Sequence, residues 1–307
     1  MRTYLLRRLV LSLLVLLGAS VATFLILHLV PGDPAQLMLA DVGASPEQVH
    51  ALRERMGLND PLVVQLGRFL WRALHLDFGY SLYSRQPVTT ELARQMPATA
   101  ELALTAFGLA TLLGVPLGVV AALWRGRWLD SVSTAGAVLG ISIPSFWLGL
   151  LLIFLFSLHL GWFPVTGQGG IERLVLPALT LALGPGALIA RLVRSSVLDV
   201  LGKEYVRVAH AKGLAPARVL LRHVLRNSLI PVVTIAGLQL GTMLSGAVVV
   251  ETVFARQGVG RLAVTAILAK DFPLVQGVVF LAAILYVSIN TVVDVLYAIL
   301  DPVIRLE

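Results

Sequence analysis

Six long apolar runs constrain the fold of this chain more than any other feature of its sequence. They lie at about 9–30, 98–123, 132–160, 174–194, 229–250 and 278–300. About 20 consecutive apolar residues suffice for a helix to cross the hydrocarbon core of a bilayer. Within that core a spanning segment must satisfy its own backbone hydrogen bonds, as a helix does. The sequence therefore predicts an all-α integral membrane protein with about six transmembrane helices.

The composition supports a membrane protein and excludes several other classes. Charged residues make up 13% of the 307 positions, whereas soluble domains carry about 25%. The chain has no cysteine, so disulfides and thiolate metal sites are excluded. Its net charge of +7 is typical of a membrane protein that retains basic residues in its cytoplasmic loops. We therefore expect membrane lipid, and no nucleic acid, around this chain.

The distribution of lysine and arginine predicts how the runs are oriented. Basic residues lie before the first run, between the second and third, and above all in 191–226 at and after the end of the fourth. By the positive-inside rule these positions are cytoplasmic, so we expect both termini in the cytoplasm. The predicted parts are residues 1–30 with the first helix, an external subdomain at 31–97 and a core at 98–307.

The external subdomain carries the signals of two helices. Residues 45–48 (Ser-Pro-Glu-Gln) predict a capping box with proline at the first helical position, and Gly57 ends that helix. Asp60-Pro61 opens a second helix, whose apolar face is formed by Leu62, Leu66, Phe69 and Leu70. Two functions of the subdomain are open: contact with an external partner, or covering the mouth of a pore.

Glycine and proline in the runs predict how the helices pack and bend. Glycines four residues apart favour close helix approach, within a compact bundle or at a subunit interface. Three such pairs occur: Gly114 with Gly118, Gly136 with Gly140, and Gly237 with Gly241. Pro144 interrupts the third run, where we expect a kink. Bent helices of this kind can line a passage, and Pro144 is a candidate for that role.

Few polar groups lie inside the runs. Gln239 is a candidate for lining a passage, although hydrogen bonding between helices explains it equally well. Glu101 and Asp294 are carboxylates near the ends of runs, which we interpret as interfacial or paired residues. They do not form the chain of buried carboxylates expected in a proton-coupled carrier.

The sequence lacks the motifs of catalysis. It contains no G-x-x-x-x-G-K-[ST] phosphate loop, no H-E-x-x-H and no G-x-S-x-G. Its six histidines are scattered. We therefore predict no catalytic residue, no metal site and no cofactor in this chain, which indicates that it is not an enzyme.

The basic loop between the fourth and fifth runs is the most informative polar segment. Residues 204–212 predict a short helix with Tyr205, Val208 and Ala209 on an apolar face, and Gly213 ends it. Pro216 opens a second helix, and Pro231 opens the next apolar run.

Two interpretations of this loop compete. Arg218, Arg222 and Arg226 recur every four residues on one side of the second helix, which is typical of a helix that binds lipid headgroups. That interpretation leaves Glu204, the small Ala209 and Ala211, and the break at Gly213 unexplained. These features fit a helix pressed into the groove of a partner protein.

The sequence of this loop resembles that of a known family. E-Y-V-R-x-A-x-A-K-G followed by H-x-L-R-N-S-L-I-P resembles the EAA loop of ABC importer permeases. Similar segments follow the family over most of the chain, at 27–35, 57–65, 140–152, 160–167, 251–262, 271–277 and 292–302. They resemble B-type subunits of the dipeptide, oligopeptide and nickel permeases. One departure is Gln257, where the family usually has proline.

The resemblance implies a type I importer permease in the bacterial inner membrane, with an external segment between helices 1 and 2. Such a chain pairs with a homologous permease and imports substrate by alternating access. An external solute-binding protein delivers that substrate, and two ATPase subunits bind ATP and Mg²⁺. The coupling loop maps to residues 195–230. The residues expected to contact the ATPase lie in this loop or directly after it: Glu204, Tyr205, Ala209, Ala211, Gly213, Arg226 and Pro231.

Several substrates and one other class of transporter remain as alternatives. We expect a dipeptide or short oligopeptide, and the family also includes glutathione and nickel-chelate permeases. A self-sufficient secondary transporter would need broken helices at the membrane midplane and ion-coupling carboxylates, of which the sequence has few.

Overall fold

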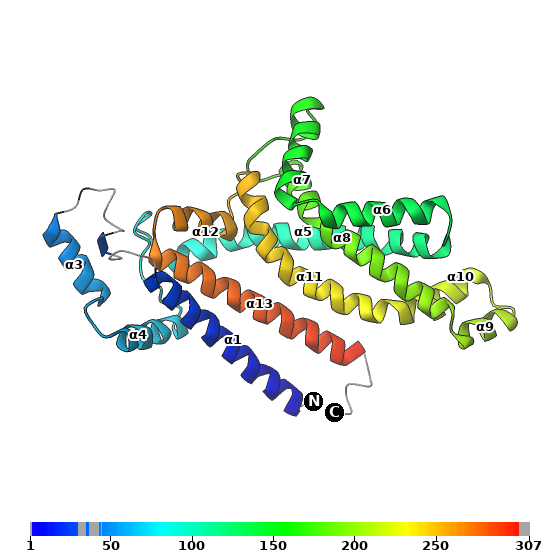
Figure 1. Ribbon diagram of the computed structural model, residues 1–307, viewed down its shortest axis with the longest axis horizontal. Helices are drawn as coiled ribbons and strands as arrows, with labels where there is room; N and C mark the ends of the chain where they lie inside the picture. The colour runs from blue at the N-terminus through cyan, green and yellow to red at the C-terminus, as the bar shows by residue number, and fades with distance from the viewer. Residues whose placement is uncertain (1, 30–34, 37–42, 44, 301–307) are drawn as a thin grey trace. The chain divides into compact units, whose positions relative to one another are not determined.

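The computed structural model describes residues 2–29, 35, 36, 43 and 45–300. Within these residues every regular element is a helix (Figure 1). The helices are α1 (Arg2–Leu29), α3 (Pro46–Met56), α4 (Leu62–Leu74), α5 (Val88–Leu123), α6 (Trp128–Ser142), α7 (Ser145–Leu152), the π-helix η2 (Ile153–His159), α8 (Glu172–Leu201), α9 (Glu204–Ala211), α10 (Pro216–Val219), the π-helix η3 (Leu220–Val224), α11 (Leu225–Val253), α12 (Val259–Leu268) and α13 (Phe272–Leu300).

The six predicted apolar runs all fall on helices, so the all-α membrane fold is confirmed. Four segments are by themselves long and apolar enough to cross a membrane: Val88–Leu123, Glu172–Leu201, Pro216–Val253 and Phe272–Val295. The bent pair formed by α6 and the α7–η2 segment makes a fifth candidate. The first run lies on α1, in which Val10–Ile26 forms an apolar stretch of the described residues.

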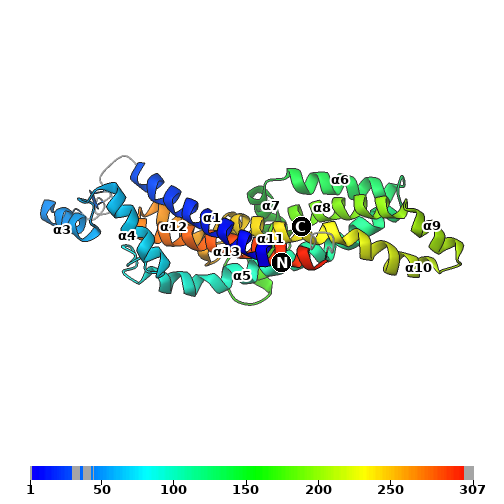
Figure 2. The ribbon, with the colours of Figure 1, turned by 90° about the horizontal axis from the view of Figure 1, so that it is seen from below.

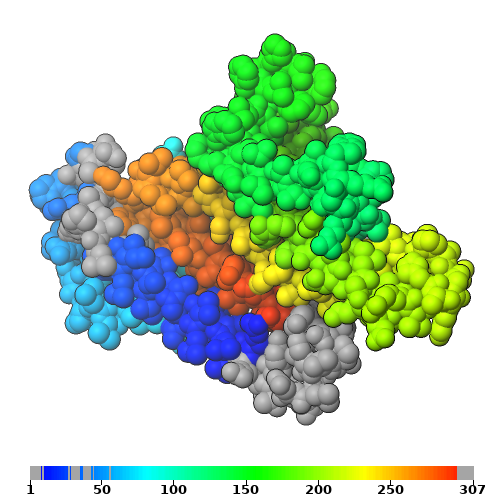
Figure 3. All heavy atoms as spheres, turned by 45° about the vertical axis from the view of Figure 1, so that its right-hand side comes forward, coloured from blue at the N-terminus to red at the C-terminus, as the bar shows by residue number. Residues whose placement is uncertain are grey.

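The third run is broken rather than gently kinked. The helix axes on the two sides of the break meet at 107°, and Figure 1 shows α7 turning away from α6. Proline forces the residue before it out of the helical conformation, and Ile143 is extended with φ −79° and ψ 122°. The segment is therefore either a broken span or a re-entrant loop. Its projecting α7 and η2, seen in Figure 3, expose large apolar side chains such as Phe154.

The chain divides into two compact units. One contains Met1–Thr99 and Gln257–Ser288, and the other contains Ala100–Arg256 and Ile289–Glu307. We refer to these as unit 1 and unit 2. In unit 1, Phe78, Val88 and Leu274 are part of a small apolar core.

Unit 2 is built around α8, which packs against α5, α6, α7 and α11. Gly114 and Gly118 bring α5 close to α8, because a Cβ on them would lie 2.6 Å from the Gly186 carbonyl oxygen and 2.4 Å from that of Ala190. The close approach predicted for this glycine pair is thus confirmed.

The glycines of the other two pairs differ in how closely a neighbouring helix approaches them. A Cβ on Gly140 would lie 3.0 Å from the Ala187 side chain, and one on Gly237 would lie 2.4 Å from Val293. Gly136 has nothing within 4 Å of that position. Gly136 therefore has no packing partner among the described residues of this chain, which leaves a subunit interface as the predicted alternative at this position.

The two helices predicted within residues 31–97 are present in unit 1. The Ser45 hydroxyl accepts from the Gln48 amide and the Gln48 side chain accepts from the Ser45 amide, which completes the capping box. Gly57 ends α3 with φ +66°. Pro61 precedes α4, whose Leu66, Phe69 and Leu70 are half-buried as predicted, whereas Leu62 is exposed at its first position.

Candidate functional site

The loop after α8 contains a short helix with one buried edge. In α9 the buried residues are Val206 and Ala209, three positions apart and therefore on one face. Tyr205 and Val208 are 44% and 46% exposed. The predicted apolar face of Tyr205, Val208 and Ala209 is thus wrong in part, because the helix is rotated so that Val206 takes the inward position.

A hydrogen bond ties α9 to the start of α11. The Asn227 side-chain amide donates to the Tyr205 hydroxyl at 3.0 Å and to the His223 carbonyl oxygen at 2.9 Å. The Ser196 hydroxyl of α8 donates to the Ser228 carbonyl oxygen at 2.8 Å. These bonds close the base of the loop. Sequence reasoning did not single out Asn227, although it lies within the family-like R-N-S motif.

The tip of the loop is exposed and sterically open. Gly213 has φ +77°, and nothing lies within 4 Å of the position of a Cβ. Glu204 and Ala211 are also exposed. The tip therefore combines the exposed Ala211 with a left-handed glycine, whereas Glu204 lies at the opposite end of α9, next to Tyr205. Figures 1 and 3 show α9 at the edge of unit 2.

The second arm of the loop runs directly into the next span. Pro216 lies in the first turn of α10, as predicted. The chain then continues through η3 into α11 as one apolar segment, Pro216–Val253. Pro231 lies inside α11 and does not open it, because the helix begins six residues earlier at Leu225. Arg226 is exposed on the first turn of α11.

A bidentate ion pair joins α6 to α8 within unit 2. The Arg194 guanidinium donates to Asp130 through Nε at 2.5 Å and through Nη2 at 2.9 Å. The Gly126 amide donates to the same carboxylate at 2.9 Å. Sequence analysis counted Arg194 only as a cytoplasmic charge, because its partner lies 64 residues away.

The residues proposed for a passage lie beside a cavity of about 170 Å³ in unit 2. Helices α6, α7, α8 and α11 line it, and Ser145, Thr180 and Thr242 are among the lining residues. Neither Pro144 nor Gln239 is among the described residues that line it. Pro144 precedes Ser145, and the Gln239 carbonyl oxygen accepts from Thr242 at 2.9 Å, so both flank the cavity.

Two buried polar contacts lie elsewhere in the units. In unit 2, the buried Arg256 pairs with Glu101, which confirms that this carboxylate is paired. In unit 1, the buried Asp271 accepts from the Ser81 hydroxyl at 2.6 Å and from the amides of Leu82 and Tyr83 at 2.9 and 3.2 Å. Asp271 therefore fixes the turn before α5 onto the start of α13.

Family models cover almost the whole chain. The model described as "Binding-protein-dependent transport system inner membrane component" matches residues 114–306. The model described as "Binding-prot-dependent transport system membrane comp, N-term" matches residues 1–103.

Full-length relatives and solved structures agree with this match. The chain is 43% identical to a putative peptide transport system permease protein of Brucella abortus, with 100% of both chains covered. It is 44% identical to the glutathione transport system permease protein GsiC of Salmonella paratyphi A, with 99% of both covered. The MetNI methionine ABC transporter in an inward-facing conformation shares the fold, with a TM-score of 0.55 at 19% identity over 69% of this chain and 97% of that chain. The chain belongs to the binding-protein-dependent transport system inner membrane components, and it is a permease subunit of an ABC importer.

Proposed function

We propose that this permease imports short peptides and is driven by ATPase subunits that dock on the exposed tip around Gly213. The observation that carries the docking site is the open, left-handed Gly213 close to the exposed Ala211, on a loop whose base is held by the hydrogen bond between Tyr205 and Asn227. Because the base of the loop is fixed and its tip is accessible, a partner that binds the tip can transmit its movement to the helices at the base.

The packing of unit 2 supports a route for that movement. Helix α8 leads into α9, and α10 continues into α11. Because α8 and α11 pack along each other, a displacement of the tip shifts both spans together. The Arg194–Asp130 pair then carries the shift to α6. Such packed elements with two discrete arrangements are the physical basis of coupling.

Short peptides are the substrate class that the relatives favour. The Brucella relative is named for peptide transport and the Salmonella relative for glutathione, which is itself a tripeptide. Glutathione is therefore the second candidate, and no comparable observation favours a nickel chelate.

The remaining parts of the transporter are proposed by analogy with the family. A homologous permease completes the pathway, an external solute-binding protein delivers the peptide, and two partner subunits bind ATP and Mg²⁺. ATP hydrolysis belongs to those subunits, so this chain is not an enzyme. Both termini and the Gly213 tip lie in the cytoplasm, and the segment 31–97 lies outside.

Two substitutions at Gly213 test the docking site. The left-handed backbone strains alanine and tryptophan alike, but only tryptophan adds bulk at the tip. In a detergent pull-down of the tagged chain coexpressed with its genomic neighbours, Gly213→Ala should keep the ATPase and Gly213→Trp should lose it. Equal retention by both variants would contradict docking at this tip.

Substrate identity is tested by transport. The purified complex is reconstituted in proteoliposomes, and its binding protein is added on the side opposite the ATPase subunits. The proteoliposomes should take up a labelled dipeptide when ATP is supplied on the side of the ATPase subunits. Uptake of glutathione in place of the dipeptide would favour the second candidate. Uptake without any ATPase subunit would contradict the proposed mechanism.

A further inference from the structure

Helix α4 of unit 1 has three distinct faces. Its inward face consists of the half-buried Leu66, Phe69 and Leu70 and the buried Ala73. A second face carries the polar Gln65, Arg68 and Arg72. The third face lies between these two on the outside of the helix and is apolar.

This third face is unusually exposed for large apolar side chains. Val63 is 81% exposed, Trp71 66% and Leu74 75%. Their spacing of eight and three residues places them within one sector of a helix with 3.6 residues per turn. Within the described residues of unit 1, nothing buries this sector, although exposed apolar patches of this kind mark an interaction surface.

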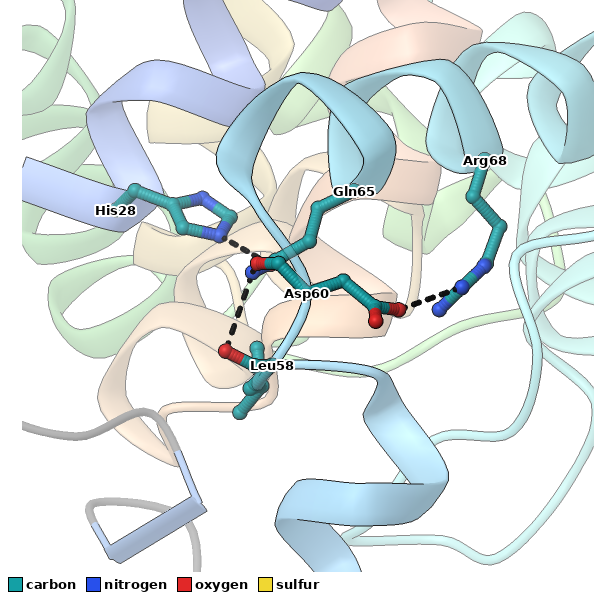
Figure 4. A network of polar contacts seen from close by, with 5 residues as sticks. All are labelled: His28, Leu58, Asp60, Gln65 and Arg68. Carbon is teal, nitrogen blue, oxygen red and sulfur yellow. Dashed lines mark hydrogen bonds and ion pairs between the residues drawn. The ribbon is translucent and has the colours of Figure 1, made fainter.

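Contacts with α1 place this surface at a defined depth. The Phe24 and Phe69 rings stack with centroids 5.9 Å apart, and His28 Nε2 donates to Gln65 Oε1 at 3.1 Å. Figures 1 and 2 show α4 beside the C-terminal end of α1, and Figure 4 shows the His28–Gln65 contact. In the sequence, the apolar run of α1 ends at about Val30, before Pro31, Gly32 and Asp33. Helix α4 is therefore held where the apolar part of a membrane helix ends, which is the depth of the lipid–water interface.

The polar face of α4 is already neutralised by acidic partners. Arg68 pairs with Asp60 at 2.7 Å, as Figure 4 shows, and Arg72 pairs with Asp77 at 3.1 Å. These arginines are consequently poor partners for an acidic protein surface or for anionic headgroups. Apolar contact is what remains for the exposed face, and tryptophan is the side chain typical of the membrane interface.

We propose that α4 lies in the lipid–water interface, with Val63, Trp71 and Leu74 inserted among the acyl chains of the adjacent leaflet. The occupant of the exposed face is lipid. This anchor fixes the segment before α5 against the membrane, and through the Asp271 contact it also fixes the turn that precedes α5. The proposal rests on the membrane crossing of α1. Only the assignment to the outer leaflet rests on the orientation given under the proposed function.

The absence of cysteine from the chain allows a direct test. Val63→Cys and Leu74→Cys, each labelled with the fluorophore NBD, are compared with Glu54→Cys on the polar α3 in the full complex reconstituted in phosphatidylcholine nanodiscs. Quenching by shallow doxyl-labelled phosphatidylcholine and by aqueous iodide is then measured. Substitution at these exposed sites removes no packing contact, so folding should be retained.

The expected result is a reversal of quencher preference between the sites. Doxyl lipid should quench positions 63 and 74 about twofold more strongly than position 54, and iodide should do the opposite, as for an interfacial helix. Replacing part of the phosphatidylcholine by an anionic lipid should leave the signals unchanged. Iodide quenching at all three sites would overturn the proposal. Protection of 63 and 74 from both quenchers would also overturn it, because a protein subunit would then cover the face.

The same samples separate this proposal from the coupling function. ATPase capture is measured on each labelled complex, and NBD reduction by membrane-impermeant dithionite in oriented proteoliposomes reports the leaflet. Loss of ATPase capture with lipid quenching intact would contradict the docking loop alone. Lipid quenching in the cytoplasmic leaflet would contradict the proposed orientation and the outer-leaflet assignment while supporting the interfacial anchor.

Discussion

At the scale of single residues, buried carboxylates hold distant parts of the chain together. Asp271 is 1% exposed, and besides the three donors of the 81–83 turn it accepts from the Leu274 amide at 3.2 Å. A carboxylate with several donors is stable in a buried position because its charge is satisfied. This explains why a carboxyl group occupies the buried position immediately before α13.

Removing this carboxylate should destabilise unit 1. Hydrogen bonds to charged groups contribute roughly 1.5–3 kcal/mol each and are not additive, so Asp271→Ala should lower the free energy of unfolding by about 3 kcal/mol or more. Ser81→Ala removes one donor and should cost about 1 kcal/mol. The measurement is the melting temperature of the purified complex in detergent. Equal melting temperatures for wild type and Asp271→Ala would contradict this role.

The Arg72–Asp77 pair should be insensitive to pH in the physiological range. Hydrogen bonds from the Arg72 guanidinium, and then from the Gly79 amide, hold the pKa of Asp77 below its usual value. A lowered folded-state pKa means that the contribution to stability is present above the unfolded pKa and is lost as the pH falls through the folded value. The NBD signal from Leu74→Cys should therefore be constant from about pH 6 to 8. A change within that range would show that another group controls the position of α4.

Local residue signals were sufficient to predict several features of the fold. Ser45 and Gly57 bound α3, Gly213 ends the α9 region and Pro216 opens α10, because each acts through its own backbone neighbours. The pairing of Asp271 with Ser81 was not predictable, since 190 residues separate the two. Local sequence patterns do not report contacts at that separation.

At the scale of helices, the contact of α5 with α8 depends on glycine. The Gly118 Cα faces the Ala190 carbonyl oxygen and the Val193 side chain. Backbone atoms cannot move aside as a flexible side chain can, so any Cβ at this position must separate the helices. Gly136 offers a matched control because its Cβ position is open.

The two glycines should respond in opposite directions to alanine. Gly118→Ala should overpack the α5–α8 contact and cost about 1–3 kcal/mol. Gly136→Ala should be neutral or stabilising by up to about 1 kcal/mol, because alanine favours the helix. Melting temperatures and the yield of folded protein distinguish them. Destabilisation by Gly136→Ala would indicate that a partner subunit packs against α6 at that position.

The bond between α9 and α11 should contribute to coupling. Tyr205→Phe removes the acceptor for Asn227 and should weaken the base of the loop by about 1 kcal/mol. We expect lower ATPase stimulation by substrate while the ATPase remains bound. Asn227→Ala should have a similar effect, and the double variant should be little worse than either single one. Full additivity would show that the two side chains act separately.

Helix patterns predicted positions better than they predicted bends and rotations. The apolar runs located every spanning helix, but the spacing of Tyr205, Val208 and Ala209 did not reveal that Val206 faces inward. Pro231 was interpreted as the start of a span, yet it lies inside α11, more than one turn after the helix begins at Leu225. Rotation and bending are set by packing against neighbouring helices, which one-dimensional periodicity does not contain.

At the scale of the whole molecule, membership of the importer family gives these local features a common purpose. Unit 2 contains the loop that we propose as the docking tip, carries it on α8 and α11, and joins α8 to α6 through Arg194 and Asp130. The break at Pro144 and the cavity beside it lie among the same helices. The central claim is that a partner ATPase moves this assembly by holding the tip around Gly213.

Site-specific crosslinking tests that claim most directly, because the chain has no native cysteine. Ala211→Cys is labelled with a photoactivatable maleimide in the assembled complex, and Glu54→Cys serves as the control. We predict a crosslink to the ATPase subunit from position 211 and none from position 54. An intact complex in which position 211 does not crosslink to the ATPase, or in which position 54 does, would contradict the account.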